Sequence, residues 1–462
     1  MSNSARPTEA SMTTQSLDLA GIGVGPFNLS LAALLSPFQD LRWRFFEKRP
    51  AFEWQGGMML PGTRMQTSFL KDLVTPVDPT SPYSFLAYLV DQGRFYRFIN
   101  AEFTRVRRIE FANYMRWTAE RIPQLSFGAA VQHVSFDSQT QRFQLEIEGR
   151  GTVQARDLVV ATGVARNIPA WAQRHMSGVC LHSGDYMRSD LSLTGQRVLV
   201  IGGGQSGAEV FLNVASGAHG EASRITWVSR RPNLEPLDET AFVNEYFTPD
   251  YVRQFHRLPE KLRGAIVESQ KLAGDGVSPD TLRELSQLLY ESDFLSSERG
   301  KQYRVLPHRE VRAMSHERGS FRVEMRNGFD HAVESVHADV VILATGYQYR
   351  LPTCLEPLSH LLTRDSGGHL VLREDYTAVW SGPEQNRIYV QNGGRYSHGI
   401  ADPQLSLAAW RAAVISNAVM GRECYRTDAA QSPVQWHSTV AAVPQHSRNA
   451  HGPAVYDDLD LA

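Results

Sequence analysis

Apolar runs along this chain alternate with glycine turns and helical patterns in an order that repeats. A short apolar strand at residues 17–20 leads into GIGVGPFN and then into an apolar helix. The same order returns from Thr194 in GQRVLVIGGGQSGAEVFLNVAS. A strand, a glycine turn and a helix in succession are typical of the βαβ unit that binds a dinucleotide. The pattern predicts two such units in an α/β protein.

The rest of the pattern supplies the other elements. Helical spacing covers 82–95 and 108–122, and alternating segments between 124 and 160 indicate antiparallel strands. We expect a small, mostly helical substrate-binding region at 236–299. The other expected elements are second strands of the two units at 42–48 and 224–231, strands at 321–327 and 339–347, and long loops at 51–84.

The two units are predicted to be nested rather than consecutive. Each runs from a strand-glycine-helix segment to a strand ending in ATG, at Ala161 and at Ala344, over nearly the same length. Because the chain continues well past the second ATG, we expect the second Rossmann-like domain to be inserted in the first. The predicted boundaries are 17–190 and 343–425 for the first domain, 191–342 for the inserted domain, and flexible ends at 1–16 and 426–462.

Composition and charge narrow the class of protein. The 462 residues are 42% apolar and 21% charged, as in a soluble globular protein of two or three domains. The net charge of -2 gives no reason to expect nucleic acid or a membrane surface as partner. No stretch resembles a membrane span or a signal peptide, so we expect a cytoplasmic protein. Cys180, Cys354 and Cys424 lack metal-ligand and redox-pair spacing, and no metal is expected.

The first glycine motif has the chemistry of a dinucleotide site with one departure. Gly21 permits the tight turn, and Gly23 lets the backbone approach a pyrophosphate. Pro26 follows Gly25 at the third glycine position, which leaves the helix N-terminus available to phosphate. Glu47 ends the second strand, where a carboxylate accepts hydrogen bonds from ribose hydroxyls. The alternative for Glu47 is a solvated surface acid.

The second motif is complete and differs at the end of its second strand. Its turn contains Gly202, Gly204, Gln205, Ser206 and Gly207. Ser229, Arg230 and Arg231 stand where an NAD enzyme carries an acid, and arginine suits a 2′-phosphate, although a merely basic loop is the alternative. The motif predicts NADPH. Two such sites in one chain are explained by a flavoenzyme in which FAD stays bound and NADPH delivers hydride to it.

Longer strings carry a more specific resemblance. The chain contains, in this order, GIGVGPFNLSLA, MQTSFLKDLVTPVDPTSPYSFLAYL, VIGGGQSGAEVFLN, WVSRRPNLEPLDETAFVNEYFTPDYV, ILATGY and HGIADPQLSLAAWR. Together they resemble the flavin-dependent amine N-hydroxylases of siderophore biosynthesis, over about residues 17–425. The segment QKLAGDGVSPDTLRELSQLLYE resembles the branch that acts on lysine and diamines, and the Gly-Thr-Asn-Tyr string of the ornithine branch is absent.

The resemblance implies a reaction. In that family NADPH reduces FAD, O2 adds at the flavin C4a, and a neutral terminal amine attacks the hydroperoxide. The tasks of the protein are to exclude water, to position the amine and to favour its uncharged form. The family also implies a homo-oligomer, a tetramer.

The resemblance also implies roles for individual residues. Met65 and Gln66 match positions near the flavin ring and the nicotinamide. Lys71 matches the lysine that pairs with the substrate α-carboxylate, and Asn244 a residue at the α-amino end or the nicotinamide ribose. The other implied contacts are Trp54, Leu405, Thr345 and Gly346 for cofactor and Ser406 for the substrate tail, while Gln55 departs from a histidine found in some members.

Several of these positions have a structural alternative. The alternatives are a surface ion pair of Lys71 with Asp72, a helix cap at Asn244, core packing at Met58, Met59 and Met65, and a structural role for His398. For Met65, core packing is the default and only the resemblance favours the functional role.

The choice of amine stays open. A lysine ammonium at position 71 favours a substrate carboxylate, whereas Asp238, Glu239 and Glu245 offer acids for a second ammonium. We expect a diamine, putrescine or cadaverine, with L-lysine and then L-ornithine as alternatives. Rival functions on the same architecture are a flavin disulfide reductase or NADPH oxidase, a sulfide or ketone monooxygenase, and a nucleotide-sensing binding protein.

Overall fold

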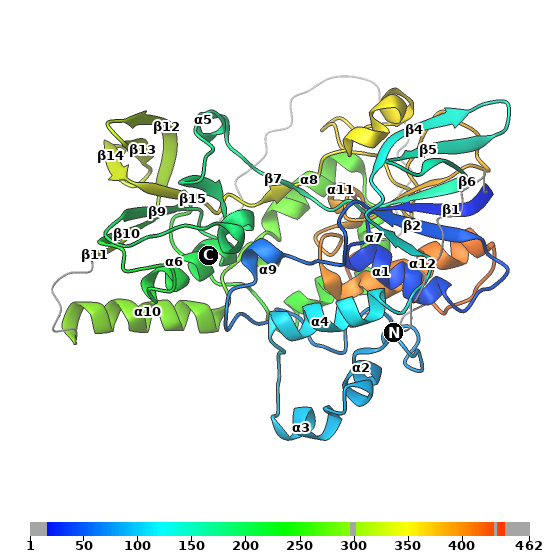
Figure 1. Cartoon of the computed structure of the whole chain (residues 1–462), viewed down its shortest axis with the longest axis horizontal. Helices are drawn as coiled ribbons and strands as arrows, with labels where there is room; N and C mark the ends of the chain where they lie inside the picture. The colour runs from blue at the N-terminus through cyan, green and yellow to red at the C-terminus, as the bar shows by residue number, and fades with distance from the viewer. Residues whose placement is uncertain (1–15, 296–301, 429–431, 439–462) are drawn as a thin grey trace, which may run out of the picture.

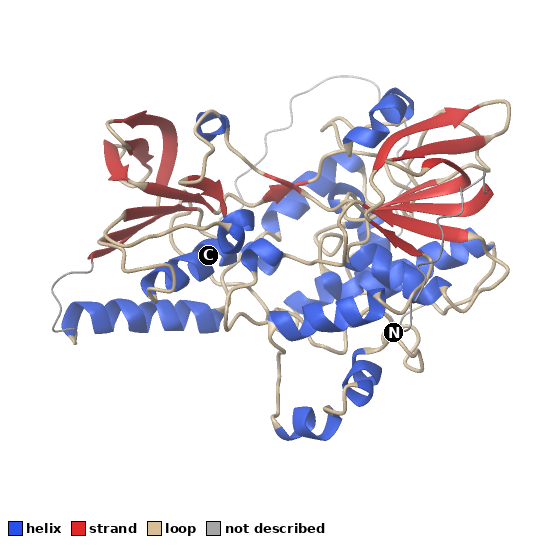
Figure 2. Cartoon of the chain, in the orientation of Figure 1, coloured by secondary structure: helices blue, strands red, loops and turns tan. Residues whose placement is uncertain are grey.

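The structure consists of two α/β domains joined by a pair of short strands (Figure 1). It is a computed structural model that describes residues 16–295, 302–428 and 432–438. Figure 2 shows most strands gathered at the two ends of the molecule, with most helices between and below them. The predicted flexible end at 1–16 lies outside the described residues except for Ser16, which opens the first strand.

The first domain is built on a seven-stranded sheet with the order β3-β2-β1-β6-β5-β4, in which β17 also pairs with β6. β1, β2, β3, β6 and β17 run parallel, whereas β4 and β5 are antiparallel. The strands are β1 (Ser16–Ile22), β2 (Trp43–Glu47), β3 (Leu125–Phe127), β4 (Val131–Asp137), β5 (Arg142–Ile147), β6 (Gly151–Val160) and β17 (Ile388–Val390).

Helices α1 (Pro26–Leu35), α4 (Arg108–Ala119) and α12 (Ala408–Met420) contribute to the apolar core of this domain. Nine of the ten residues of α1 are buried, which explains why its sequence is apolar all round. Helices α2 (Phe85–Asp91) and α3 (Phe95–Asn100) project below the domain in Figure 1. The other short segments are the 3-10 turns η1 (Gly56–Met58), η4 (Thr353–Leu361) and η5 (Leu405–Leu407).

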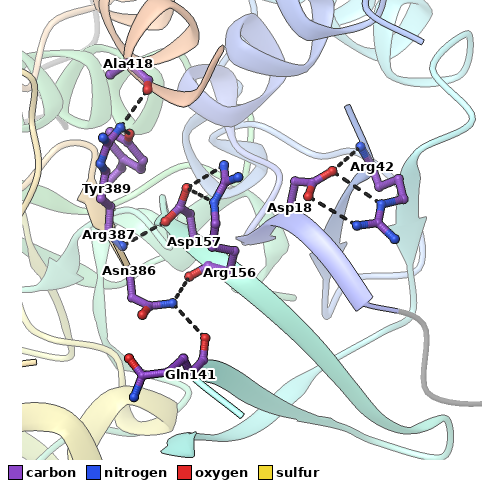
Figure 3. Close-up of polar contacts among 9 residues, drawn as sticks. All are labelled: Asp18, Arg42, Gln141, Arg156, Asp157, Asn386, Arg387, Tyr389 and Ala418. Atoms are coloured by element: carbon purple, nitrogen blue, oxygen red, sulfur yellow. Dashed lines mark hydrogen bonds and ion pairs between the residues drawn. The ribbon is translucent and has the colours of Figure 1, made fainter. Parts of the chain in front are cut away.

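The chain returns to the first domain near its end, as predicted. Figure 3 shows the polar contacts that tie β17 and α12 to β6. The buried Asp157 accepts a hydrogen bond from the Arg387 N–H at 2.8 Å and pairs with Arg156 at 3.0 Å. Asn386 donates to the Arg156 carbonyl at 2.9 Å, and Arg387 Nη1 donates to the Ala418 carbonyl at 2.6 Å. The returning segment is therefore part of the first domain.

The second domain repeats this plan. A five-stranded parallel sheet, β11-β10-β9-β15-β8, is accompanied by an antiparallel sheet, β12-β13-β14. The pairing of β8 moves the start of this domain ahead of the predicted boundary at 190, because a three-residue strand leaves almost no sequence pattern. The elements are α5 (Ala170–Gln173), β8 (Cys180–His182), η2 (Ser183–Arg188), β9 (Arg197–Ile201), α6 (Gln205–Ala215), β10 (Arg224–Val228), β11 (Gln302–Leu306), β12 (Arg309–Glu317), β13 (Ser320–Asn327), β14 (Val333–Ala338) and β15 (Val340–Leu343).

The predicted helical region is helical and touches both domains. Within the described residues it comprises η3 (Val243–Phe247), α7 (Pro249–His256), α8 (Glu260–Ser269), α9 (Leu272–Asp275) and α10 (Pro279–Phe294). Helix α10 packs on α6 of the second domain, whereas α7 and α8 pack on α11 (Arg395–His398) of the first. It therefore lies across the junction of the two domains.

Part of the segment expected to be a flexible tail is packed. The Trp436 ring packs against those of Tyr246 and Tyr251, with ring centroids 5.3 and 4.9 Å away. Ser432 Oγ donates to Glu245 at 2.8 Å. The prediction was wrong for these described residues because a polar composition concealed one aromatic anchor; residues 429–431 and 439–462 lie outside the described part.

Two crossings connect the domains. β7 (Ala165–Arg166) pairs antiparallel with β16 (Tyr347–Gln348). Over the described ranges, no helix is both long and apolar enough to span a membrane.

Candidate dinucleotide sites and active site

The first glycine turn packs against the end of β6. Gly23 has a φ of +85°, and a Cβ atom there would lie 2.7 Å from the Ala161 carbonyl oxygen, so this position requires glycine. A Cβ at Gly21 would lie 2.2 Å from the Phe45 ring. Helix α1 follows with Gly25 as N-cap and no side chain capping its N–H groups. The turn and the free helix N-terminus fit the pyrophosphate of a dinucleotide.

Glu47 ends β2 beside this turn and is buried. Its carboxylate accepts hydrogen bonds from the Val24 N–H at 2.8 Å and from Arg49 Nε at 2.9 Å. Burial acts to raise the pKa of this carboxyl, but the hydrogen bonds from Arg49 and Val24 outweigh it and hold the pKa below its usual value. Glu47 is therefore an ionised, positioned acid and not a solvated surface residue.

The second glycine turn repeats the first. Gly202 has a φ of +133°, and a Cβ there would lie 2.0 Å from the Ala344 carbonyl oxygen. A Cβ at Gly207 would lie 2.1 Å from the Gly202 oxygen. Only glycine at position 207 therefore allows helix α6 to pack this closely against the turn. Gly204 is the N-cap of α6, again without a side-chain cap. In both domains the carbonyl of the ATG alanine supports the glycine turn.

The end of β10 presents arginine rather than acid. Ser229 is buried, and its Oγ accepts a hydrogen bond from the Arg231 N–H at 3.1 Å. Arg231 Nη1 is buried without a hydrogen-bond partner among the described residues, while its Nε lies 3.8 Å from Glu235. Arg230 is exposed beside it. A buried cationic donor without a partner next to a dinucleotide turn fits a 2′-phosphate.

Two other residues of the turn differ in their surroundings. The Gln205 amide is already bonded, to Glu209 at 3.0 Å, to Thr281 at 3.2 Å and to the Ser278 N–H at 2.8 Å. Ser206 is half-buried with no side-chain hydrogen bond among the described residues. Gln205 therefore ties α6 to the start of α10, whereas Ser206 is available to a ligand.

The loop MQTSFLKDL combines core and exposed positions. Met65 is buried in the apolar core of the first domain, and its N–H donates to the Val106 carbonyl at 2.9 Å. Met58 is buried in a second cluster, and Gln66 is exposed. Core packing is therefore the observed environment of both methionines, and the contact of Met65 with a flavin stays a prediction.

Lys71 is half-buried and Asp72 does not neutralise it. Asp72 is buried and accepts four hydrogen bonds, from the N–H groups of Val74, Thr75 and Phe85 and from the Thr75 hydroxyl. No carboxylate of the described chain lies within ion-pair distance of Lys71. Burial lowers the pKa of its ammonium group. The surface-pair alternative is wrong, and within the described residues the half-buried cation has no anionic partner.

Asn244 is exposed on η3 and does not cap α7. The cap is Thr248, whose Oγ1 accepts from the Tyr251 N–H at 3.3 Å. Asn244 Nδ2 donates to the Glu239 carbonyl at 3.2 Å, which leaves its amide oxygen available. The helix-cap alternative is therefore wrong.

The three acids considered for a second ammonium already have partners. Glu239 forms an ion pair with Arg105, and Glu245 accepts from Ser432 at 2.8 Å. Asp238 accepts from the Thr240 hydroxyl at 3.0 Å. A diamine would need to share one of these carboxylates with its present partner.

The closing segment after β17 contains one unpartnered polar atom. Ser406 Oγ is buried and has no hydrogen-bond partner among the described residues, while the neighbouring Leu405 is half-buried against the core. His398 is buried and stacked on Tyr376 with centroids 4.0 Å apart, and burial lowers the pKa of its imidazole well below the usual value. His398 therefore has a structural role, whereas the Ser406 hydroxyl is available to hydrogen-bond a ligand.

The remaining predicted positions lie at the edges of the site. Trp54 packs against Phe111, with centroids 6.4 Å apart, and Gln55 adopts a left-handed φ of +48°. Thr345 and Gly346 lie at the domain crossing, where the Thr345 hydroxyl donates to the Asn167 carbonyl at 2.5 Å. These contacts make the second ATG segment part of the domain crossing as well as a candidate cofactor contact.

Several buried polar residues around these turns were not predicted from the sequence. Asn28, on the otherwise apolar α1, donates to the Gly23 carbonyl at 2.7 Å and accepts from Gln391 at 2.7 Å. Arg108 and Glu209 form a buried ion pair between the domains. A polar residue within an apolar helix was the available signal for Asn28. Among the described residues, no group of three potential metal ligands gathers anywhere.

Comparison with known proteins places these features in one family. Residues 15–349 match the model of the L-lysine 6-monooxygenase/L-ornithine 5-monooxygenase family. The L-lysine N6-monooxygenase of Escherichia coli is 41% identical over 92% of this chain and 99% of its own length. The FAD-bound cadaverine monooxygenase of desferrioxamine biosynthesis from Erwinia amylovora superimposes with a TM-score of 0.86 at 29% identity, over 92% of this chain and 100% of its own.

An ornithine N-hydroxylase from Kutzneria sp. 744, solved with reduced FAD, NADP+ and L-ornithine, gives a TM-score of 0.81 at 26% identity, over 88% of this chain and 99% of its own. These matches cover both dinucleotide domains and the helical region between them. They agree with the resemblance carried by the motifs. The chain belongs to the L-lysine 6-monooxygenase/L-ornithine 5-monooxygenase family of flavin-dependent amine N-monooxygenases.

Proposed function

We propose that this protein is an L-lysine N6-hydroxylase that uses FAD, NADPH and O2 and provides a hydroxylated amine for siderophore biosynthesis. The FAD and NADPH assignments are supported by the two glycine turns, by Glu47 and by the buried Arg231 Nη1, which has no hydrogen-bond partner among the described residues. Relatives solved with FAD and with NADP+ support the same pair. The tetramer expected from the family stays a prediction.

The environment of Lys71 is the observation that favours L-lysine as the substrate. Its ammonium is half-buried, burial lowers its pKa, and no carboxylate of the described residues neutralises it. A substrate α-carboxylate would supply that missing charge, whereas a diamine would bring a second cation to the same place. This reverses the order that the sequence suggested, in which a diamine came first.

A diamine is the second candidate. The likeness to the cadaverine monooxygenase favours it. Against it, Glu239 forms an ion pair with Arg105, and Asp238 and Glu245 accept hydrogen bonds from hydroxyl groups, so a second ammonium would have to share its acid with a present partner. L-Ornithine comes third because the string typical of that branch is absent.

The side chains described above have separate tasks in this reaction. FAD, once reduced by NADPH, supplies the activation of O2. Lys71 anchors the carboxylate end of the substrate, and the Ser406 hydroxyl and the Asn244 amide oxygen offer hydrogen bonds to its polar groups. The buried apolar surroundings of Met65 and Leu405 exclude water and disfavour a charged terminal amine.

Replacement of Lys71 by methionine tests the proposal. Loss of a charged contact worth ~1.4 kcal/mol or more raises the KM for L-lysine at least about tenfold. The KM for cadaverine stays within about twofold, because that substrate has no carboxylate. Steady-state rates of hydroxylamine formation with both substrates measure the difference.

The matched control is Lys261→Met, which removes an exposed lysine of α8 and leaves both KM values unchanged. An unchanged KM for L-lysine in Lys71→Met would remove Lys71 from the carboxylate site. Wild-type catalytic efficiency higher with cadaverine than with L-lysine would establish the diamine candidate instead.

A further inference from the structure

One buried ion pair crosses from the first domain to the second. Arg108 opens α4, and Glu209 lies on α6, the helix of the second glycine turn. Arg108 Nη2 lies 2.8 Å from Glu209 Oε1, and Nη1 lies 3.2 Å from Oε2. The side chains are only 10% and 7% exposed. This two-point contact between planar groups fixes an angle as well as a distance.

The pair belongs to a line of hydrogen bonds that reaches the nucleotide turn. Arg108 Nη1 also donates to the Met58 carbonyl at 2.9 Å, in η1 of the first domain. Glu209 Oε1 accepts from Gln205 Nε2 at 3.0 Å, and Gln205 accepts from the Ser278 N–H at 2.8 Å. The line therefore runs from η1 through α4 and α6 to the start of α10.

The other ion pairs that cross the junction are more exposed. Arg188 with Glu53 has side chains 45% and 38% exposed, and Arg105 with Glu239 has 33% and 30%. Exposed pairs are screened by solvent and hold an orientation weakly. The covalent links are the two short crossings at β7 and β16. Among the described cross-domain pairs, Arg108 with Glu209 is the buried one.

We propose that the Arg108–Glu209 pair is a positioning device that sets the orientation of the second dinucleotide domain on the first, so that the nicotinamide site faces the flavin site. Arg108 and Glu209 are positioning residues here, since they act through α6 and its turn. The proposal concerns the two nucleotide domains and does not depend on which amine is the substrate.

The test measures domain orientation directly in the FAD-loaded enzyme. Spin labels are attached at Glu120→Cys, at the end of α4, and at Ser286→Cys on α10, both exposed positions. Cys424→Ser removes the more accessible native thiol, while Cys180 and Cys354 are buried. Pulsed electron resonance then gives the distance distribution between α4 and α10.

Two variants break the pair in different ways. Glu209→Gln keeps the size and an acceptor for Gln205, and Arg108→Lys keeps the charge but loses the planar fork; either one carries the test if the other does not fold. Both are expected to shift or broaden the distance distribution. The control is Asp339→Asn, which removes the pair of Asp339 with Arg197 inside the second domain, with Arg197 Nε 3.0 Å from the carboxylate, and leaves the distribution unchanged.

Anaerobic reduction provides the second measurement. The rate at saturating NADPH falls at least about tenfold in the pair variants, because misplaced reacting groups lose rate steeply. NADPH affinity stays within about threefold, and reduction by dithionite, which needs no nicotinamide site, is unchanged. An unaltered distance distribution in both variants overturns the proposal whatever the rates, and so does an altered distribution with normal reduction by NADPH.

Discussion

The two dinucleotide domains share the same glycine-turn backbone but differ at the end of their second strands. In both, a glycine at positive φ packs on the carbonyl oxygen of an ATG alanine, Gly23 on Ala161 and Gly202 on Ala344. The second strand of the first domain ends in the buried, bonded Glu47, whereas that of the second ends near Arg231, which keeps a donor without a partner. The shared backbone creates a phosphate site, and the strand end selects the nucleotide.

The helices that follow the two glycine turns differ in how completely they are buried. Helix α1 is buried along nearly its whole length and is further held through Asn28 and Gln391. Helix α6 is less completely buried, with seven of its 11 residues buried, and is held by Glu209 and Gln205. The more deeply buried helix suits a cofactor that stays bound, and the less buried one suits a cofactor that exchanges.

Alanine at the glycine turns gives the largest expected effects and separates the two domains. Gly23→Ala places a Cβ 2.7 Å from the Ala161 oxygen and should abolish FAD retention, whereas Gly202→Ala, at 2.0 Å from Ala344, should abolish NADP+ binding and leave FAD in place. FAD content after gel filtration and calorimetric titration with NADP+ measure the two losses. Gly319→Ala is the control, since it has a φ of +80° with no atom near the added Cβ.

That result would be contradicted by loss of FAD in Gly202→Ala to the same extent as in Gly23→Ala. The two turns would then not act as separate sites. Loss of both nucleotides in Gly319→Ala would show that backbone strain alone explains the effect.

Removal of the Arg231 guanidinium tests the difference between the two strand ends. Arg231→Ala should reduce the preference for NADPH over NADH about 10- to 100-fold, from the loss of a charge-assisted contact worth ~1.5–3 kcal/mol. The ratio of kcat/KM values for the two nucleotides measures it. Arg230→Ala, at an exposed position, should change the ratio less. An unaltered preference in both variants would remove the 2′-phosphate from this strand end.

The smallest expected effect is a pH dependence at Glu47. The pKa of Glu47 is lower in the folded protein than its usual value of 4.5, so the stability from its ionised form is present above that value and is lost as the pH falls through the folded pKa. Glu47→Gln should lower the Tm at pH 7 by about 2–4 °C, equivalent to ~1 kcal/mol. The difference from wild type should shrink below about pH 4.5. A difference that is constant between pH 7 and pH 4 would mean that the charge of Glu47 is unimportant.

The sequence revealed features that depend on neighbours in the chain. The glycine turns, their strands and the ATG segments are local patterns, and their repetition predicted the inserted domain. The three-residue strand β8 and the anchor Trp436 have no such pattern, so the boundary at 190 and the tail were misplaced. Arg108 and Glu209 lie 101 positions apart and meet only when the domains pack.

The same limit applies at Lys71. The motif located it, but its neighbour Asp72 looked like a natural partner in sequence. The structure shows Asp72 used by four donors from its own loop and from Phe85. Only the folded structure shows that Asp72 leaves the charge of Lys71 unpaired. This observation changes the proposed substrate from a diamine to L-lysine.

The proposed L-lysine N6-hydroxylase activity is tested most directly by measuring hydroxylamine formation by the FAD-loaded enzyme with NADPH and O2. L-Lysine, cadaverine, putrescine and L-ornithine are compared side by side, with hydrogen peroxide measured in parallel. We predict that L-lysine gives the highest kcat/KM and that its hydroxylated product accounts for most of the NADPH consumed. Peroxide as the sole product with all four amines would contradict it.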